Sequence, residues 1–183
     1  MINIQSIKTE TRNAKTTYID ELPITDIMTL INEEDAVVPL ALSRALPALS
    51  KIAEHISSAF TEGGRLIYIG AGTSGRIGVL DASECPPTYG TDPSQVVGII
   101  AGGNNALTDA LEGAEDDEQA GREDIQHISI TSKDIIVALA ASGRTPYTLA
   151  AMKAAKEIGA LTAAIVCSPH SPMARKPISR SSC

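Results

Sequence analysis

The stretch RLIYIGAGTSGRIGVLDASECPPT, residues 65–88, decides the fold of this chain. It opens with Leu66–Ile69, a short apolar run that is typical of a strand buried on both faces of a parallel sheet. A glycine-rich turn over Gly70–Gly72 follows, and the next residues lead into a segment whose apolar side chains have helical spacing. This order of strand, turn and helix predicts an α/β domain.

The turn between this strand and its helix predicts an anion site. The first amide N–H groups of a helix have no partner inside the helix, and the positive end of the helix dipole adds to their field. The candidate phosphate-binding residues are therefore Gly72, Thr73, Ser74 and Gly75. Pro86 is expected to stop the helix, because proline lacks an amide N–H and disfavours helical backbone at the preceding residue. Glu84 would then stand in a stiff corner at the carboxyl end of the helix.

Composition and charge restrict the class of protein. Of the 183 residues, 43% are hydrophobic and 20% are charged, which is enough for a packed core built from small aliphatic side chains. The net charge of −7 disfavours nucleic-acid and anionic-membrane partners. The three cysteines have no metal-ligand spacing, so no metal site is expected. The polar start and the lack of any run of transmembrane length predict a cytoplasmic protein.

Strands and helices alternate through the rest of the chain. Further strands are expected at 96–100, 135–140 and 161–167, with helices over 104–114 and 145–159. Before the first strand we expect a short helix over 26–31, capped by Thr25, and a long one that begins at 32–35 and ends near residue 60. The pattern predicts a doubly wound parallel sheet in a three-layer αβα arrangement, preceded by N-terminal helices.

A second loop at the same edge of the sheet strengthens the binding hypothesis. In doubly wound sheets ligands sit outside the carboxyl ends of the strands. The predicted third strand ends in a loop that contains Ser142, Gly143, Arg144 and Thr145, again rich in glycine and hydroxyl groups. Taken alone, Ser142 and Thr145 could equally be turn and cap residues. Because two such loops share one edge, we favour contact with a ligand.

Two alternatives concern the motifs themselves. The glycines at 70, 72 and 75 also match the dinucleotide fingerprint, but that site needs an acid at the end of the second strand, where residues 99–103 have none. Two carboxylates, Glu84 and Glu115, are candidates for acid–base work. An acidic run such as 115–118 is usually a solvated surface, although on a helical wheel Glu115 lies beside the face formed by Leu107 and Leu111. Spacing leaves both readings open.

Three long stretches carry a resemblance to a known family. IGAGTSGRIGVLDASECPPTYG (69–90), IAGGNNALTDALEGAEDD (100–117) and ALAASGRTPY (138–147) closely resemble the N-acetylmuramic acid 6-phosphate etherases, which belong to the sugar isomerase (SIS) domain group. The similarity extends from about Thr9 to about Ser171. It implies an enzyme, a lyase that cleaves the D-lactyl ether of N-acetylmuramate 6-phosphate to N-acetylglucosamine 6-phosphate and D-lactate, in recycling of cell-wall sugar.

The resemblance also implies roles for single residues. Glu84 matches the proton donor to the departing lactate oxygen, and Glu115 matches the second acid–base group. Thr73, Ser74, Ser142 and Thr145 match positions around the sugar phosphate. The family route is elimination followed by hydration, without metal or organic cofactor. Because ten helical residues span about 15 Å, Glu84 would lie far from that phosphate, and we expect a homodimer with shared sites.

The resemblance ends near residue 173. Where the family continues through another strand and helical section, this chain reads ARKPISRSSC, which we interpret as a truncated or altered end. The expected divisions are N-terminal arm and helices 1–60, an incomplete SIS-like sugar-phosphate domain 61–172 and a divergent tail 173–183. An associating protein with little etherase turnover would follow. The rival functions are a sugar-phosphate-binding regulator without catalysis, and an aldose–ketose isomerase, which should lack the SECPPT and EGAEDD stretches.

Overall fold

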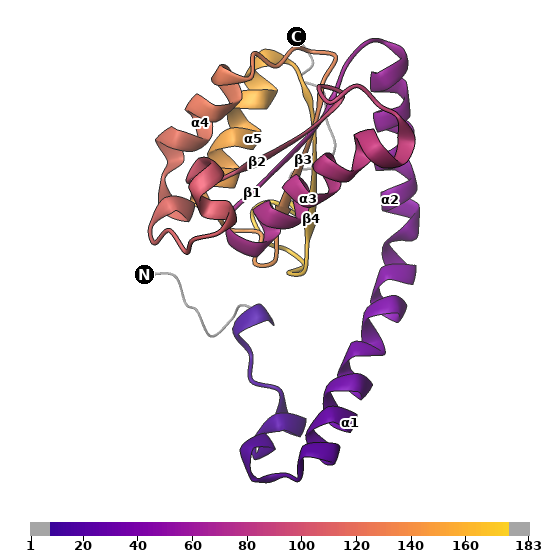
Figure 1. Cartoon of the computed structure of the whole chain (residues 1–183), viewed down its shortest axis with the longest axis vertical. Helices are drawn as coiled ribbons and strands as arrows, with labels where there is room; N and C mark the ends of the chain where they lie inside the picture. Colours follow the sequence, from indigo (N-terminus) through magenta and orange to yellow (C-terminus); the bar gives the residue numbers. More distant parts are fainter. Residues whose placement is uncertain (1–7, 176–183) are drawn as a thin grey trace. The chain divides into compact units, whose positions relative to one another are not determined.

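The computed structural model describes residues 8–175, and contacts along the chain divide it into two compact units, Met1–Glu54 and His55–Cys183. The second unit contains a four-stranded sheet (Figure 1). Its strands are β1 (Leu66–Gly70), β2 (Val96–Ile100), β3 (Ile135–Ala140) and β4 (Leu161–Val166), in the order β2-β1-β3-β4. Each neighbouring pair is parallel. The predicted doubly wound sheet is confirmed.

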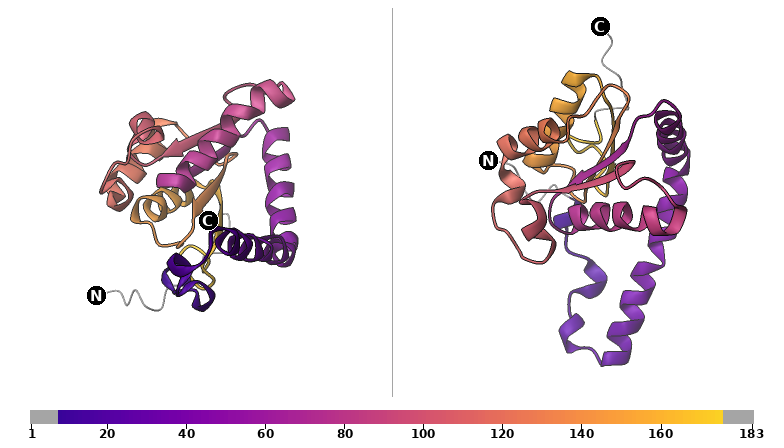
Figure 2. Two further views of the ribbon diagram at one scale, coloured as in Figure 1. Left: turned by 60° about the horizontal axis from the view of Figure 1, so that its bottom comes forward. Right: turned by 45° about the horizontal axis from the view of Figure 1, so that its top comes forward.

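Helices cover both faces of this sheet. α3 (Gly72–Tyr89) packs against β1 and β2, whereas α5 (Pro146–Ile158) packs against β3 and β4 and carries α4 (Glu118–His127) on its outer side. The views of Figures 1 and 2 agree that α3 lies on one face and the α4–α5 pair on the other. A hydrophobic core cluster joins side chains of β1, β3 and α5, among them Ile67, Ile136 and Ala151. The three-layer arrangement therefore matches the prediction.

The sequence GAGTSG folds β1 tightly onto α3. A Cβ atom added at Gly75 would lie 2.7 Å from the Ile100 side chain and 2.8 Å from the carbonyl oxygen of Gly70. Only glycine allows so close an approach of helix and strand. The consequence is that the N-terminus of α3 sits directly at the carboxyl end of β1.

The prediction that α3 stops before Pro86 is wrong. The helix runs through Pro86 and Pro87 to Tyr89 and is closed by Gly90 in the left-handed conformation, whose N–H donates to the carbonyl of Pro86. Proline here removes only two hydrogen bonds from the last turns, where the neighbouring Ser83 is exposed and water can reach the carbonyl groups. Glu84 is therefore a helical residue and does not stand in a corner.

The expected helix over 104–114 is also wrong. Two short 3-10 segments stand there instead, η5 (Gly103–Leu107) and η6 (Ala114–Asp116). Glycines 102, 103 and 113 all have positive φ angles, and this backbone is incompatible with a continuous α-helix. α4, which the sequence analysis did not anticipate, begins right after, with the Asp117 side chain accepting a hydrogen bond from the N–H of Ala120.

The first unit is helical. Three short segments, η2 (Lys8–Glu10), η3 (Ala14–Thr16) and η4 (Ile19–Glu21), precede α1 (Ile24–Asp35) and α2 (Val37–Thr61). The predicted short helix is thus longer than 26–31 and starts after Pro23 rather than after a Thr25 cap. Side chains of the arm contact α1, since the amide of Asn13 and the ammonium of Lys15 donate to Glu34 over 2.8 and 2.7 Å. Pro47 lies inside α2.

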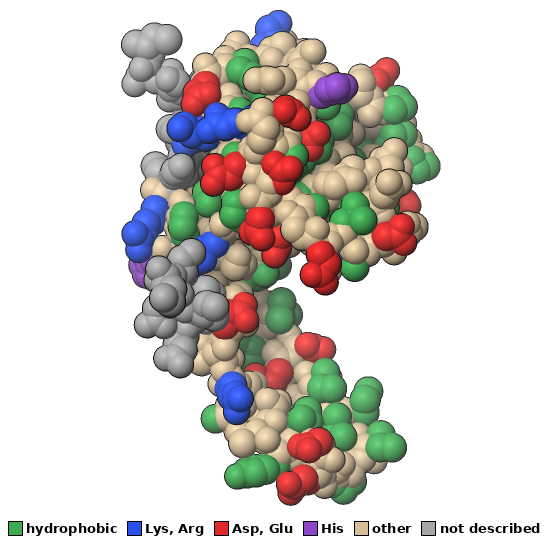
Figure 3. All heavy atoms as spheres, turned by 90° about the vertical axis from the view of Figure 1, so that its left-hand side faces the viewer, with side chains coloured by type: hydrophobic (Ala, Val, Ile, Leu, Met, Phe, Trp, Pro, Cys, Tyr) green, Lys and Arg blue, Asp and Glu red, His purple; other side chains and the backbone are tan. Residues whose placement is uncertain are grey.

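The N-terminal helices expose much apolar surface, visible as green side chains in the lower part of Figure 3. The exposed large residues include Ile24, Met28, Ile31, Val37, Val38, Leu40, Leu42 and Leu46. By length and composition, Ile24–Thr61 could cross a membrane, and little of its most apolar part is buried. The expectation that no run approaches transmembrane length is therefore wrong as to length, because a single residue separates α1 from α2. A helix of this kind is also typical of packing against another protein surface.

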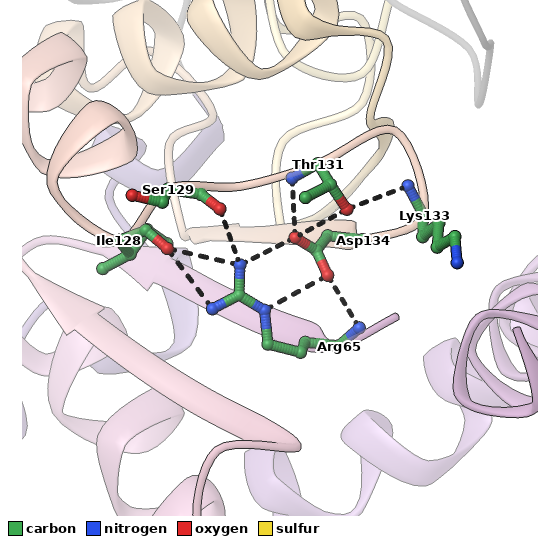
Figure 4. Close-up of polar contacts among 6 residues, drawn as sticks. All are labelled: Arg65, Ile128, Ser129, Thr131, Lys133 and Asp134. Carbon is green, nitrogen blue, oxygen red and sulfur yellow. Dashed lines mark hydrogen bonds and ion pairs between the residues drawn. The ribbon is translucent and has the colours of Figure 1, made fainter. Parts of the chain in front are cut away.

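A saturated ion-pair network closes the amino-terminal edge of the sheet (Figure 4). Asp134 is buried just before β3, and its carboxylate accepts hydrogen bonds from the backbone and the guanidinium of Arg65 and from the amide of Thr131, the shortest at 2.8 Å. The guanidinium of Arg65 also donates to the carbonyl oxygens of Ile128 and Ser129. This arrangement ties β1 to the turn that precedes β3.

Candidate functional site

Two loops meet at the carboxyl-terminal edge of the sheet. Gly70 of β1 pairs with Leu139 of β3, so the two strands end side by side. Gly72 begins α3 two residues after Gly70, and Ser142 lies in the turn three residues after Leu139. The structure therefore brings the residues 72–75 and 142–145 to neighbouring strand ends.

The loop of residues 142–145 is supported from behind by the chain that follows β4. Gly143 has a φ of +64°, and a Cβ atom there would clash with the Ser171 side chain. The carbonyl of Gly143 accepts a 3.1 Å hydrogen bond from the N–H of Met173, whose side chain is fully buried. Within the loop the N–H of Arg144 donates to Ser142 Oγ over 3.3 Å. Residues up to Met173 thus help to shape this loop.

The first turn of α5 fixes the other end of this loop. Thr145 is the N-cap residue and Pro146 is the first helical residue, so α5 begins where the helix over 145–159 was expected, although the Thr145 side chain makes no capping hydrogen bond. Tyr147 is fully buried and donates its phenolic hydrogen to Asp124 of α4. Burial, together with this carboxylate, raises the pKa of Tyr147, which stays protonated and holds α5 on α4.

A cavity of about 360 Å³ opens beside the N-terminus of α3. One wall is formed by the start of α3 and the end of β2, and the other by the irregular chain between η5 and η6. The lining residues are Ala71, Gly72, Arg76, Ala101, Ala106, Asp109, Ala110, Leu111, Glu112, Gly113, Ala114 and Glu115. The cavity joins a helix N-terminus, one guanidinium and three carboxylates, a combination suited to a ligand with an anionic group and several hydroxyls.

Sequence reasoning missed several of these residues. Arg76 lies one helical turn after Gly72, and its Nε and Nη2 atoms donate to the carbonyl oxygens of Leu107 and Asp109 over 3.1 and 3.0 Å. Helical spacing from Gly72 was the available signal for Arg76. Asp109 and Glu112 could not be found in this way, because their places depend on the non-helical path of residues 107–113.

The two candidate carboxylates lie in different places. Glu115 belongs to η6, is exposed and lines the cavity together with Gly72. Glu84 is exposed in α3, twelve residues after Gly72, which corresponds to about 18 Å along a helix. It does not line the cavity. A Pro-Pro corner that folds Glu84 back is excluded because α3 continues to Tyr89.

The surface around the site is mostly acidic, as the net negative charge of the chain predicts. In Figure 3 Asp and Glu side chains are spread over the visible face of the sheet unit, while the basic groups lie mainly along one edge. An anionic ligand would therefore depend on local donors at α3 and the 142–145 loop. Across residues 8–175, no group of three or more His, Cys, Asp or Glu side chains is placed to hold a metal ion.

Comparison with known proteins shows strong similarity. Residues 48–156 match the family described as the glucokinase regulatory protein N-terminal SIS domain. A Photorhabdus laumondii protein named N-acetylmuramic acid 6-phosphate etherase is 55% identical over 172 residues, covering 94% of this chain and 57% of the relative. Its namesake from Aeromonas hydrophila is 51% identical over 174 residues, covering 95% and 58%. This chain thus spans a little over half the length of these relatives.

Solved structures with the same fold are more distant in sequence. A phosphoheptose isomerase from Francisella tularensis superposes with a TM-score of 0.65 at 20% identity, covering 79% of this chain and 76% of that one. The corresponding isomerase from Neisseria gonorrhoeae gives a TM-score of 0.60 at 16% identity, covering 78% and 73%. At this level of identity the likeness concerns the fold.

Proposed function

Because this chain belongs to the SIS-domain family, we propose that its carboxyl-edge site binds N-acetylmuramate 6-phosphate and cleaves the D-lactyl ether, giving N-acetylglucosamine 6-phosphate and D-lactate. The observation that carries the proposal is that Gly72, at the N-terminus of α3, and Glu115 line one cavity. Relatives about half identical over nearly the whole chain are named for this reaction. The reaction belongs to recycling of cell-wall sugar in the cytoplasm, and it uses the side chains of the site without a cofactor.

The phosphate is assigned to the two loops. The free amide groups at the start of α3, in residues 72–74, suit a phosphate, and the dipole of an eighteen-residue helix adds to the attraction. The N–H of Gly75 is already engaged, because it donates to the carbonyl of Ala71 over 3.2 Å. Ser142 and Thr145, on the neighbouring strand end, supply hydroxyl groups, and Gly143 lets the backbone of that loop turn toward them. Arg144 adds a positive charge to the same loop.

The sugar ring is assigned to the cavity. Glu115 stands on its wall and removes the C2 proton as the C3–oxygen bond to lactate breaks, which leaves a C2–C3 double bond. Protonation of the departing lactate oxygen is the role of Glu84. Water then adds across the double bond, so that a hydroxyl group replaces the lactyl ether at C3 and the proton returns to C2.

The position of Glu84 leads to a shared site. A carboxylate about 18 Å along α3 from the phosphate position cannot serve the same hexose in one chain. We therefore assign Glu84 to the site of a second copy, in a homodimer. The apolar side chains exposed on α1 and α2 provide surface that a second copy can cover. A sugar phosphate and a second copy are then the partners of this chain, and neither a nucleic acid nor a membrane is required.

Mixed dimers test the shared site. The substitutions Glu84→Gln and Ser142→Ala are made separately in this chain, continued after Ser171 with the C-terminal part of the Photorhabdus laumondii relative. Each variant should be impaired alone and should regain part of the activity when the two are combined, because one of the two sites in the mixed dimer then carries neither substitution. Isolation of the mixed dimer with two different affinity tags, followed by a lactate assay, provides the measurement. Mixed dimers no more active than either parent dimer would show that Glu84 does not act across subunits.

The competing function is sugar-phosphate binding without catalysis, as the description of the matching family, a regulatory protein domain, suggests. Both glutamates are present, and the relatives named as etherases match this chain over 94–95% of its length, which favours the enzyme. An aldose–ketose isomerase shares the fold but is not favoured, because the stretches around Glu84 and Glu115 belong to the resemblance with the etherases.

Two measurements separate these functions. Titration calorimetry with N-acetylglucosamine 6-phosphate tests the binding site, and release of D-lactate from N-acetylmuramate 6-phosphate tests catalysis. Both are made on this chain and on a chimera that continues after Ser171 with the C-terminal part of the Photorhabdus laumondii relative. Binding together with lactate release supports the etherase. Binding without lactate release from either protein would favour the regulator.

A further inference from the structure

We propose that Arg76 is a positioning residue that clamps the outer wall of the cavity, residues 107–112, onto α3 and thereby fixes the space for the sugar ring. The inference rests on the proposed function only for the identity of the ligand. The clamp itself is a property of the free protein. It assigns a role to the single Lys or Arg side chain among the residues that line this cavity.

The clamp consists of two hydrogen bonds from one guanidinium group. Nε of Arg76 donates to the carbonyl oxygen of Leu107 over 3.1 Å, and Nη2 donates to that of Asp109 over 3.0 Å. Both acceptors are backbone atoms, so the contact fixes the path of the wall rather than one of its side chains. A planar guanidinium can reach two carbonyl groups in a fixed geometry, which the single ammonium of lysine cannot reproduce.

The wall has few other supports. η5 ends at Leu107 and η6 begins at Ala114, so no regular helix or strand holds the residues between them. Residues 108–112 are exposed. Other supports that the structure describes are hydrogen bonds from the N–H groups of Thr108 and Asp109 to the carbonyl of Asn105, and the packing of Leu111 near Gly102. Without the guanidinium this segment is expected to open readily.

The wall matters because it completes the cavity opposite the phosphate loop. Asp109, Leu111 and Glu112 lie on the wall, Gly72 lies on the α3 side, and Glu115 follows the wall directly in the chain. A wall that moves would leave the phosphate position at α3 unchanged but would disturb contacts with the rest of the sugar. Arg76 therefore affects the binding of a sugar phosphate more than the binding of phosphate alone.

Hydrogen exchange on the ligand-free chain tests the clamp directly. Arg76→Ala, Arg76→Met and Arg76→Lys are compared with the parent and with Arg122→Met, which removes a surface guanidinium from α4 that lies 3.8 Å from Glu157. We expect amide exchange of Thr108 and Asp109, whose N–H groups donate to the carbonyl of Asn105, to rise at least tenfold in all three Arg76 variants. Exchange in β3 and the melting temperature should stay at the values of the parent and of the Arg122 variant.

Binding of two ligands then separates positioning from charge. Affinity for N-acetylglucosamine 6-phosphate should fall at least tenfold in the Arg76 variants, including the lysine variant, while affinity for inorganic phosphate stays within about twofold. Unchanged exchange at Thr108 and Asp109, or full function with lysine, would overturn the clamp. Equal losses for both ligands would show that Arg76 acts by its charge. A parent chain that binds neither ligand would refute the proposed function, and the exchange result would still decide the clamp.

Discussion

The two edges of the same sheet are built in opposite ways. At the amino-terminal edge Asp134 is buried and accepts hydrogen bonds from Arg65 and Thr131, so that the charges are paired inside the protein. At the carboxyl-terminal edge the chain ends its strands in glycine-rich loops, and the carboxylate of Glu115 stands exposed beside an open cavity. The closed edge stabilises the fold, and the open edge is left for a ligand.

This difference follows from the cost of burying polar groups. A buried charge stabilises only when its partners satisfy it, as they do around Asp134. A binding site instead needs donors and acceptors without protein partners. Water forms hydrogen bonds with these groups until a ligand displaces it. Substitutions at the two edges should therefore separate stability from ligand binding.

The largest effect on stability is expected at the closed edge. Asp134→Ala leaves the guanidinium of Arg65 partly buried without its carboxylate, and this should lower the free energy of unfolding by about 3–5 kcal/mol. Chemical denaturation measures the change. The control is Glu123→Ala on the exposed side of α4, which should change stability little. A loss below about 1 kcal/mol at Asp134 would contradict the distinction between the edges.

A smaller effect is expected at the open edge, on binding rather than on folding. Ser142→Ala and Ser74→Ala each remove one hydroxyl from a phosphate loop and should weaken binding of N-acetylglucosamine 6-phosphate by about 1–3 kcal/mol. Titration calorimetry measures the affinity, with inorganic phosphate as competitor. Ser50→Ala in α2 is the matched control for loss of a hydroxyl. Unchanged affinity in both loop variants would remove these loops from the site.

The mildest perturbation of the closed edge is acid. Burial alone would raise the pKa of Asp134, but the hydrogen bonds from Arg65 and Thr131 outweigh it and hold the pKa below the ordinary value. The stabilisation is complete above the unfolded-state pKa, about 3.9, and is lost as the pH falls through the lower folded-state value. Thermal melts between pH 7 and pH 2.5 should show this loss in the parent and a smaller one in the Asp134→Ala variant. Equal acid sensitivity would argue against the pair.

The sequence predicted the sheet well because its strands are short apolar runs between glycine-rich turns. Val96–Ile100 and Ile135–Ala140 have the predicted bounds. The bounds expected for the helix over 145–159 are also correct, because Thr145, Pro146 and Gly159 each have a preferred place at a helix end.

The predictions for residues 86–127 were wrong where packing or backbone conformation overrode a local sequence rule. Pro86 predicts the end of α3 by its missing amide, yet the helix tolerates the loss in its last turns. Leu107 and Leu111 have helical spacing, but the glycines around them set a different path. α4 was not predicted because Gly121 weakens the helical pattern of its sequence. A glycine is needed there because a side chain would clash with the backbone of Tyr147. The cavity wall and the role of Arg76 depend on this path and could not be read from spacing.

The same limits apply to the two carboxylates. Glu115 reached the cavity by η6, although the helical wheel that first pointed to it describes a helix that does not form. The helical rise predicted that Glu84 lies far from the phosphate loop. This still holds in the structure, because α3 is continuous from Gly72 past Glu84. The position of a carboxylate can thus be predicted from the sequence only when the helix or strand that carries it is also predicted correctly.

The central claim is that Glu115 at the open edge performs acid–base chemistry on a bound sugar phosphate. The most direct measurement is release of D-lactate from N-acetylmuramate 6-phosphate by the chimera described above, with and without Glu115→Gln, alongside calorimetric binding of N-acetylglucosamine 6-phosphate. Loss of an acid–base group should slow release by about 10²–10⁴-fold while binding stays within about twofold. Lactate release at the parent rate by the Glu115→Gln protein would contradict the claim.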